Sequence, residues 1–275
     1  FQQTVRKIDH RTLKNYFDKH YHTQSTSLFV VGDVDPGDVM KQSEKMLAKM
    51  RTGKRAEVPK VPRYDRSTKV QVVTGDRDIK ECHVQIAWPA PTISHSDLAS
   101  YDILCSAIGS GESSPLYQHL VKDTKVALDV GMGLVAPARC GMAVANLQVE
   151  PEKLDAPLKE ISALLPKLSE TEIDPSQVDR VKTSLEADVV GGKETVEGYA
   201  RRLGYYYVQF GEPEYERKYL EQALNVSTEQ ATQALRQTLD HFPVVSLVHP
   251  TSMKVSAPTI AKYFSRVSRK PLKNA

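Results

Sequence analysis

The side chains that could hold a metal ion are scattered along this sequence. None of the eight histidines belongs to an H-x-x-E-H pattern, which on one helix would bring two imidazoles to zinc and a glutamate to the attacking water. His20 and His22 flank Tyr21, and at that spacing they would point to different faces of a helix, so we interpret them as ordinary surface histidines. The sequence predicts no metal ligand and no catalytic residue in this chain. The histidines are His10, His20, His22, His83, His95, His119, His241 and His249.

Two serines precede a histidine closely enough to be candidate nucleophiles. Ser113 and Ser114 lie shortly before His119, but no G-x-S-x-G turn frames either serine. Serines within a small-residue break usually cap helices, and we interpret these two in that way.

Composition and charge are those of an ordinary folded protein. The 275 residues, 40% of them apolar, can bury a core in one large domain or two smaller ones. A net charge of +3, from 37 basic and 34 acidic residues, is too small to indicate nucleic-acid binding. No apolar run approaches the ~18 residues of a membrane span. The cysteines have apolar neighbours and no C-x-x-C spacing, and we interpret them as buried reduced thiols: Cys82, Cys105 and Cys140.

The compartment stays open. The cysteines neither demand nor exclude an oxidising environment, and the chain begins at Phe1 without a methionine, so any targeting signal is expected upstream. The bacterial periplasm, the cytoplasm and an organelle matrix are all compatible with the sequence.

An aromatic cluster follows a pair of glycines late in the chain. Tyr199 to Phe210, beside Arg201 and Arg202, could stack on single-stranded nucleic acid, but without a basic net charge we favour a core and interface role. Gly191-Gly192 lacks a phosphate-loop pattern and is interpreted as a bend between helices.

The stretch 101–135 contains the elements that would position a site. It predicts a buried helix, a break at Gly109–Ser114, a second helix opened by Pro115, and a strand from Val126. The change from helical spacing to alternation marks the passage from helix to strand. The apolar positions are expected to be buried in the core, and they are Leu116, Leu120 and Val121, and then Val126, Leu128 and Val130.

Further elements flank this unit on both sides. Helices are predicted at 9–21, 35–50, from Ser94 or Ser96 to 108, at 154–168, from 174 and at 227–241; strands are predicted at 27–31, 69–74, 81–88, 142–149 and 244–248. Directly joined strands and grouped helices indicate an α+β layer sandwich, in which helices pack on a largely antiparallel sheet.

Four segments are expected from this order. Residues 1–53 are too few to close a core alone and are interpreted as the C-terminal remnant of a preceding domain. A proline-containing, basic linker at 54–68 then leads to one domain at 69–250. Residues 251–275 are interpreted as a basic tail or linker, with Lys254, Lys262, Arg266, Arg269, Lys270 and Lys273.

Three stretches carry a resemblance to a known family. Ser114-Pro115-Leu116-Tyr117-Gln118-His119-Leu120 resembles the S-R-L-Y-Q-E-L segment of the M16 metallopeptidases, the family of pitrilysin, insulinase and mitochondrial processing peptidase. Residues 28–36, preceded by 16–21, resemble the end of the family's first domain, and 183–211 resembles the helical middle of its second. The resemblance implies the metallohydrolase-type fold of LuxS and the processing peptidases.

The resemblance also implies a role for this chain. Aligned on Gln118 to Leu120, Val121 and Leu128 occupy the positions of an arginine and a tyrosine that bind substrate in active domains. This implies a non-catalytic domain of a zinc metalloendopeptidase, which encloses a chamber and holds extended peptide beside an upstream catalytic domain and possibly a second M16 half. Zinc would then belong to the full-length protein, if the upstream domain carries H-x-x-E-H, and not to this chain. The alternative is a structural or interaction subunit without peptidase activity.

Overall fold

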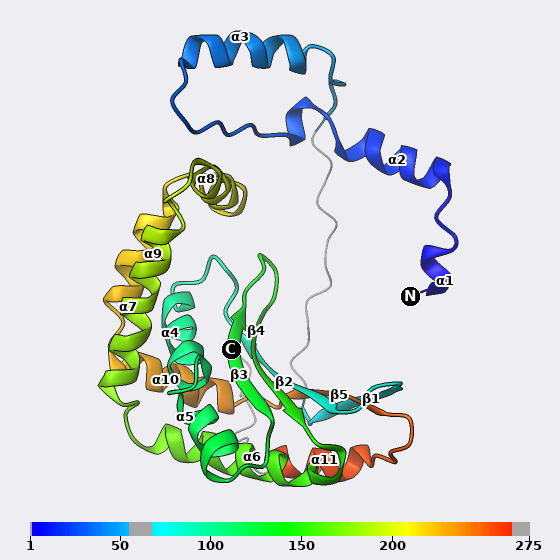
Figure 1. Ribbon diagram of the computed structural model, residues 1–275, viewed down its shortest axis with the longest axis vertical. Coiled ribbons are helices and arrows are strands. Elements are labelled where there is room, and N and C mark those ends of the chain that lie inside the picture. Colours follow the sequence, from blue (N-terminus) through cyan, green and yellow to red (C-terminus); the bar gives the residue numbers. More distant parts are fainter. Residues whose placement is uncertain (1, 55–67, 266–275) are drawn as a thin grey trace. The chain divides into compact units, whose positions relative to one another are not determined.

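The chain folds into two compact units. The computed structural model describes residues 2–54 and 68–265 (Figure 1). The smaller unit takes in Phe1–Pro62 and Val189–Tyr215, and the larger unit takes in Arg63–Asp188 and Glu216–Ala275. The boundaries fall within α7 (Pro175–Gly191) and at the start of α9 (Tyr215–Leu224).

A five-stranded sheet is the centre of the larger unit. Its strands are β1 (Gln71–Arg77), β2 (Cys82–Ala90), β3 (Asp129–Val135), β4 (Gly141–Val149) and β5 (Val244–Pro250). They lie in the order β1-β5-β2-β4-β3, and only the β1–β5 pair is parallel. The predicted α+β architecture with a largely antiparallel sheet is therefore confirmed.

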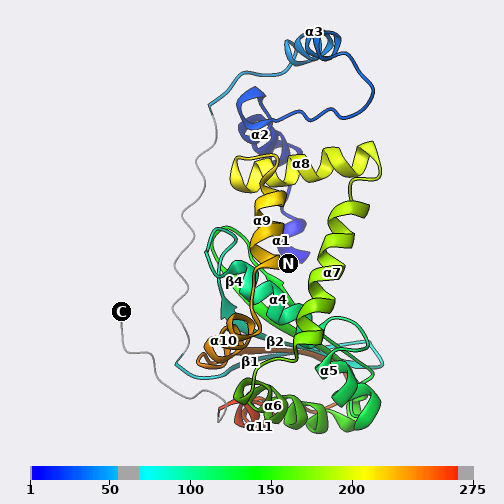
Figure 2. The same cartoon turned by 90° about the vertical axis from the view of Figure 1, so that its left-hand side faces the viewer.

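Helices cover one face of this sheet (Figures 1 and 2). They are α4 (Leu98–Gly109), α6 (Asp155–Glu170), α10 (Thr228–Leu239) and α11 (Ala257–Phe264), with a short 3₁₀ helix η3 (Pro151–Lys153) before α6. Helix α4 packs on β3 and β4, α10 on β2, and α11 on β1. The alternation in β2 explains the packing, because Val84, Ile86 and Trp88 all point into the core. Burying each such side chain contributes roughly 1.5–3 kcal/mol.

The break after α4 has the glycine and proline features that the sequence predicts. Gly111 has a φ of +80°, which favours glycine, and Pro115 is the first residue of α5 (Pro115–Tyr117). The helix then widens into a π-helix, η2 (Gln118–Asp123), in which the Thr124 N–H donates to the His119 carbonyl at 3.0 Å. The apolar spacing of Leu116 and Leu120 indicated a helix but not this wider turn.

The smaller unit contains α1 (Gln2–Val5), α2 (His10–His20), the 3₁₀ helix η1 (Thr23–Ser25), α3 (Pro36–Leu47) and α8 (Val196–Phe210). Asp9 caps α2 by accepting from the Thr12 N–H at 2.7 Å. The strand predicted at Ser27–Val31 is wrong, because the described residues of this unit offer no second strand to pair with it. Phe29 instead meets the Tyr207 ring of α8 edge-on, with the ring centroids 5.5 Å apart.

The structure corrects the predictions for one histidine, one cysteine and one helix cap. His22 is 2% exposed and is not a surface histidine, since its ring lies against Gly53 and hydrogen-bonds to Ser25. Cys82 and Cys105 are buried thiols as predicted, whereas Cys140 is exposed. Neither Ser94 nor Ser96 caps α4, which begins after Asp97 without a side-chain cap.

The predicted basic tail is partly folded. Within 251–275, residues 257–264 form α11, and its Ile260 and Phe264, one helical turn apart, are buried in the core. The basic residues of this stretch indicate a solvated tail, whereas the four-residue spacing of this apolar pair is the signal for the helix. Residues 55–67, which are most of the predicted linker, and Arg266, Arg269, Lys270 and Lys273 lie outside the described residues. No helix in the described ranges has the length and apolar character needed to cross a membrane.

Candidate functional site

Val121 and Leu128, which the resemblance aligns with the family's arginine and tyrosine, lie on either side of one turn. Val121 belongs to η2, is half-buried and packs against the core. Leu128 precedes β3, and its side chain is 43% exposed, which corrects the prediction that it is buried. Between them the chain reverses, with the Val126 and Ala127 N–H groups donating to the Leu120 carbonyl at 3.0 and 3.1 Å.

These positions offer no polar side chain to a substrate. The Leu128 backbone N–H donates to the Gln148 carbonyl of β4 at 2.8 Å, and the leucine side chain has no atom that can form a hydrogen bond. An aliphatic side chain can neither donate to a developing oxyanion nor supply positive charge to it. The local fold holds both positions beside the sheet, but their chemistry is limited to packing.

Serine chemistry is not assembled at the break. The Nε2 atom of His119 lies 2.9 Å from Glu160 Oε2 of α6. Ser114 is fully buried, and its Oγ has no hydrogen-bond partner among the described residues. The Ser113 carbonyl accepts from Gln177 at 3.2 Å. Histidine and serine are therefore held by different neighbours, and the arrangement lacks the hydrogen bond that activates a nucleophile.

The described residues do not offer a ligand set for zinc. Across 2–54 and 68–265, no group of three or more histidine, cysteine, aspartate or glutamate side chains could hold a metal ion. A catalytic zinc site needs three protein ligands around an open position. The described side chains do not fit such a centre.

A partly buried carboxyl group, Asp102, links two helices of the larger unit. Tyr219 Oη of α9 donates a hydrogen bond to Asp102 Oδ2 of α4. Burial raises the pKa of the Asp102 carboxyl, and the tyrosine hydrogen bond opposes part of this rise. Burial, together with the nearby Asp102, also raises the pKa of the Cys105 thiol, so this cysteine is an inert core residue.

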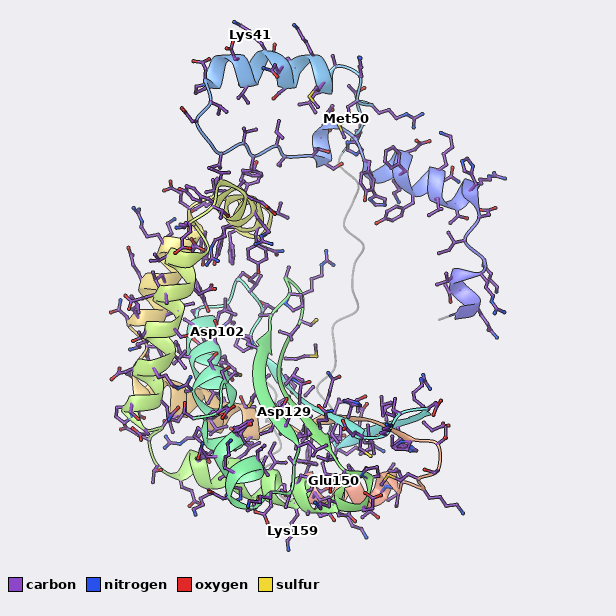
Figure 3. The ribbon with its side chains drawn as sticks, in the orientation of Figure 1. Lys41, Met50, Asp102, Asp129, Glu150 and Lys159 are labelled. Atoms are coloured by element: carbon purple, nitrogen blue, oxygen red, sulfur yellow. The ribbon has the colours of Figure 1, made fainter. Side chains whose placement is uncertain are left out.

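The face of the sheet opposite α4, α10 and α11 carries polar side chains in register. The sequence analysis did not predict a site there. His83 pairs with Gln148, which pairs with Asp129, and in the next row Gln85 pairs with Asn146. Figure 3 labels Asp129 at the start of β3. The sequence does show that alternate residues of β2 and β4 are polar, which indicates that one face of each strand is exposed. These polar residues form one continuous patch only when the pairing of β2, β4 and β3 is known.

Comparison with known proteins assigns the family. The model of the peptidase M16 inactive domain matches residues 7–185, which is more than half of the chain. The chain belongs to this family. The M16 resemblance of the sequence is therefore confirmed, and so is the inactive-domain character inferred from it.

Relatives of this M16 inactive domain are named as proteases. The chain is 27% identical over 232 residues to the zinc protease PqqE of Helicobacter pylori, covering 80% of this chain and 51% of the relative. It is 23% identical over 257 residues to an uncharacterized zinc protease of Streptomyces coelicolor, covering 91% and 56%. The chain thus spans little more than half the length of these relatives.

Solved structures share the fold of this M16 domain. A protease from Helicobacter pylori superposes with a TM-score of 0.80 at 19% identity, covering 91% of this chain and 61% of that chain. A peptidase M16 inactive domain from Pseudomonas fluorescens superposes with a TM-score of 0.79 at 17% identity, covering 92% and 61%. At these identities the likeness concerns the fold, and it agrees with the predicted layer sandwich.

Proposed function

We propose that this chain is the non-catalytic part of a longer zinc-dependent M16 metalloendopeptidase, in which it encloses the substrate chamber and holds extended peptide. The observation that carries the proposal is the inactive-domain match over residues 7–185, together with relatives that are named zinc proteases. The aliphatic side chains at Val121 and Leu128 support a role without transition-state contacts. The zinc would be bound by an upstream domain that carries H-x-x-E-H.

The domain boundaries belong to the same proposal. Residues 1–53 would complete a preceding M16 domain, and 69–250 would form the core of the inactive domain. Exposed apolar side chains on α2, among them Leu13 at 59% and Phe17 at 54%, support a missing partner for the first segment. An upstream M16 domain of the same protein is the partner that we propose.

Peptide would be held by backbone hydrogen bonds at a sheet edge. In the described sheet, β1 pairs only with β5, and β3 pairs only with β4, so each has one free edge. An extended peptide can add to such an edge as a further strand. This use of the backbone needs no catalytic side chain, which suits an inactive domain.

The full-length protein tests the proposal. We expect it to cleave unstructured peptides and to hold one zinc per catalytic domain, whereas residues 1–275 alone cleave nothing and retain no stoichiometric zinc. Peptidase assays and metal analysis on both proteins provide the measurements. A full-length protein that neither cleaves peptide nor binds zinc would instead support a structural subunit. Cleavage by residues 1–275 alone would contradict a non-catalytic role.

A further inference from the structure

In the larger unit, two adjoining hollows lie on the face of the sheet opposite α4, α10 and α11. One, of about 370 Å³, is lined by polar side chains that include His83 and Asp129. The other, of about 340 Å³, is lined by small and apolar residues that include Ala87 and Val144. The two hollows adjoin along one groove, because three residues line both of them: Gln85, Asn146 and Ser246.

The polar end of this groove carries negative charge. Asp129 is exposed at the start of β3, and no described residue forms an ion pair or hydrogen bond with its carboxylate. Glu81 lies two residues before His83, on the same face, and accepts a hydrogen bond from the neutral amide of Gln148. No described residue forms an ion pair with either carboxylate, and the negative potential at Asp129 attracts a positively charged side chain.

The middle of the groove offers one hydrogen-bond donor and one acceptor, which could pair with a backbone amide. Gln85 Nε2 donates to Asn146 Oδ1 at 3.0 Å across the β2–β4 pair. This bond leaves the Gln85 Oε1 atom as an acceptor and the Asn146 Nδ2 atom as a donor, both on the exposed side. A backbone amide has the complementary pair, one N–H and one C=O.

The apolar end lies at a fixed distance from the charged end. Ala87 pairs with Val144, which pairs with Gly133, and Gly133 lies four residues after Asp129 on β3. At a rise of about 3.3 Å per residue the two rows are roughly 13 Å apart. An extended peptide has the same rise, so its residues i and i+4 would reach the two ends on one face.

We propose that this groove binds an extended peptide segment that carries a lysine or arginine side chain at the Asp129 end and an apolar side chain four positions away. The inference deepens the proposed function and rests on it for peptide as the ligand class. The carboxylates of Asp129 and Glu81 favour a positively charged peptide over an uncharged one. The distance between the Asp129 and Gly133 rows sets the four-residue spacing of the peptide's two side chains. The binding surface is the face of the sheet, whereas the proposed strand addition uses an edge.

The test is peptide binding by residues 1–275, observed by NMR of the ¹⁵N-labelled chain. The probe is a soluble ten-residue peptide with arginine at position 3 and leucine at position 7. Matched peptides replace the arginine by citrulline, which keeps its shape without the charge, or by glutamate. We expect the side-chain NH₂ signals of Gln85 and Asn146 to shift, and the arginine peptide to bind roughly fivefold more tightly than the citrulline peptide at low salt. Asp129→Asn should remove this preference.

Asp76→Asn is the matched control, since Asp76 is an exposed carboxylate of β1 on the opposite face of the sheet, and it should leave the preference unchanged. The inference is overturned if the peptide does not bind, if only backbone signals of β1 or β3 shift, or if Asp129→Asn binds like the wild type. It is also overturned if the Gln85 and Asn146 signals shift with protein concentration alone, because a second copy would then occupy the face. Cleavage is not measured, so this result is independent of the peptidase assay on the full-length protein.

Discussion

Gly109 at the end of α4 lies directly against Met132 of β3. A Cβ atom on Gly109 would be 2.4 Å from the backbone nitrogen of Met132 and 2.4 Å from its Cβ. Both distances are far inside van der Waals contact. Helix α4 and β3 therefore pack at a separation that requires glycine at this position, although its φ is not in the left-handed region.

Gly109→Ala should destabilise the larger unit, because the added methyl group would push α4 away from backbone atoms that cannot yield. We expect a loss of about 1–3 kcal/mol in the free energy of unfolding, measured by chemical denaturation. Gly133→Ala is the control on the same strand, since a Cβ there would meet nothing within 4 Å. Equal losses for the two variants would contradict this explanation.

Periodicity predicted most of the fold, but not the contacts of single residues. The alternation in β2 and β4 placed both strands, since one face of each is buried. The sequence at Ser27–Val31 has the same strand-like pattern but forms no strand, because a strand also needs a partner strand elsewhere in the chain. The sequence shows a glycine at 109, but it does not show that Met132 lies against it. In the same way, the sequence does not show that the His22 ring is buried against Gly53.

The candidate groove could be predicted only in part. Two alternating strands showed that Gln85 and Asn146 lie on exposed faces. That they hydrogen-bond each other depends on the register of β2 and β4, which long-range pairing determines. The charge of Asp129 was visible in the sequence, but its position beside the same row depends on the β3–β4 register.

Ser227 should contribute more to stability than Ser96, although the sequence places both at the predicted start of a helix. Ser227 Oγ accepts from the Gln230 N–H at 3.1 Å, and Gln230 Oε1 accepts from the Ser227 N–H at 2.8 Å, which completes a capping box on α10. Ser227→Ala should cost about 1 kcal/mol in the free energy of unfolding. Ser96→Ala should change it by less than about 0.5 kcal/mol, because Ser96 caps no helix. A larger loss at Ser96 would revise the start of α4.

Asp102 should make the stability of the protein depend on pH in acid. Because burial raises its pKa, the folded protein holds this proton more tightly than the unfolded chain does. The stabilisation is complete below the unfolded pKa of about 3.9 and is lost as pH rises through the higher folded pKa. Asp102→Asn should remove this fall from a plot of the free energy of unfolding against pH.

The control for Asp102 is Asp123→Asn, which neutralises an exposed carboxyl at the end of η2. This variant should keep the fall that Asp102 causes. If Asp102→Asn and the wild type lost stability in parallel over the same pH range, the proton on Asp102 would not be the cause.

Val121 and Leu128 should respond differently to truncation, because only Val121 packs against the core while Leu128 is 43% exposed. Val121→Ala should cost about 1–2 kcal/mol in the free energy of unfolding, and Leu128→Ala less than about 0.5 kcal/mol. In the full-length protein, neither change should lower peptide cleavage per folded molecule, since neither side chain can assist a transition state. If Leu128→Ala left stability intact and abolished cleavage, this position would act on substrate, and the domain could not be called non-catalytic.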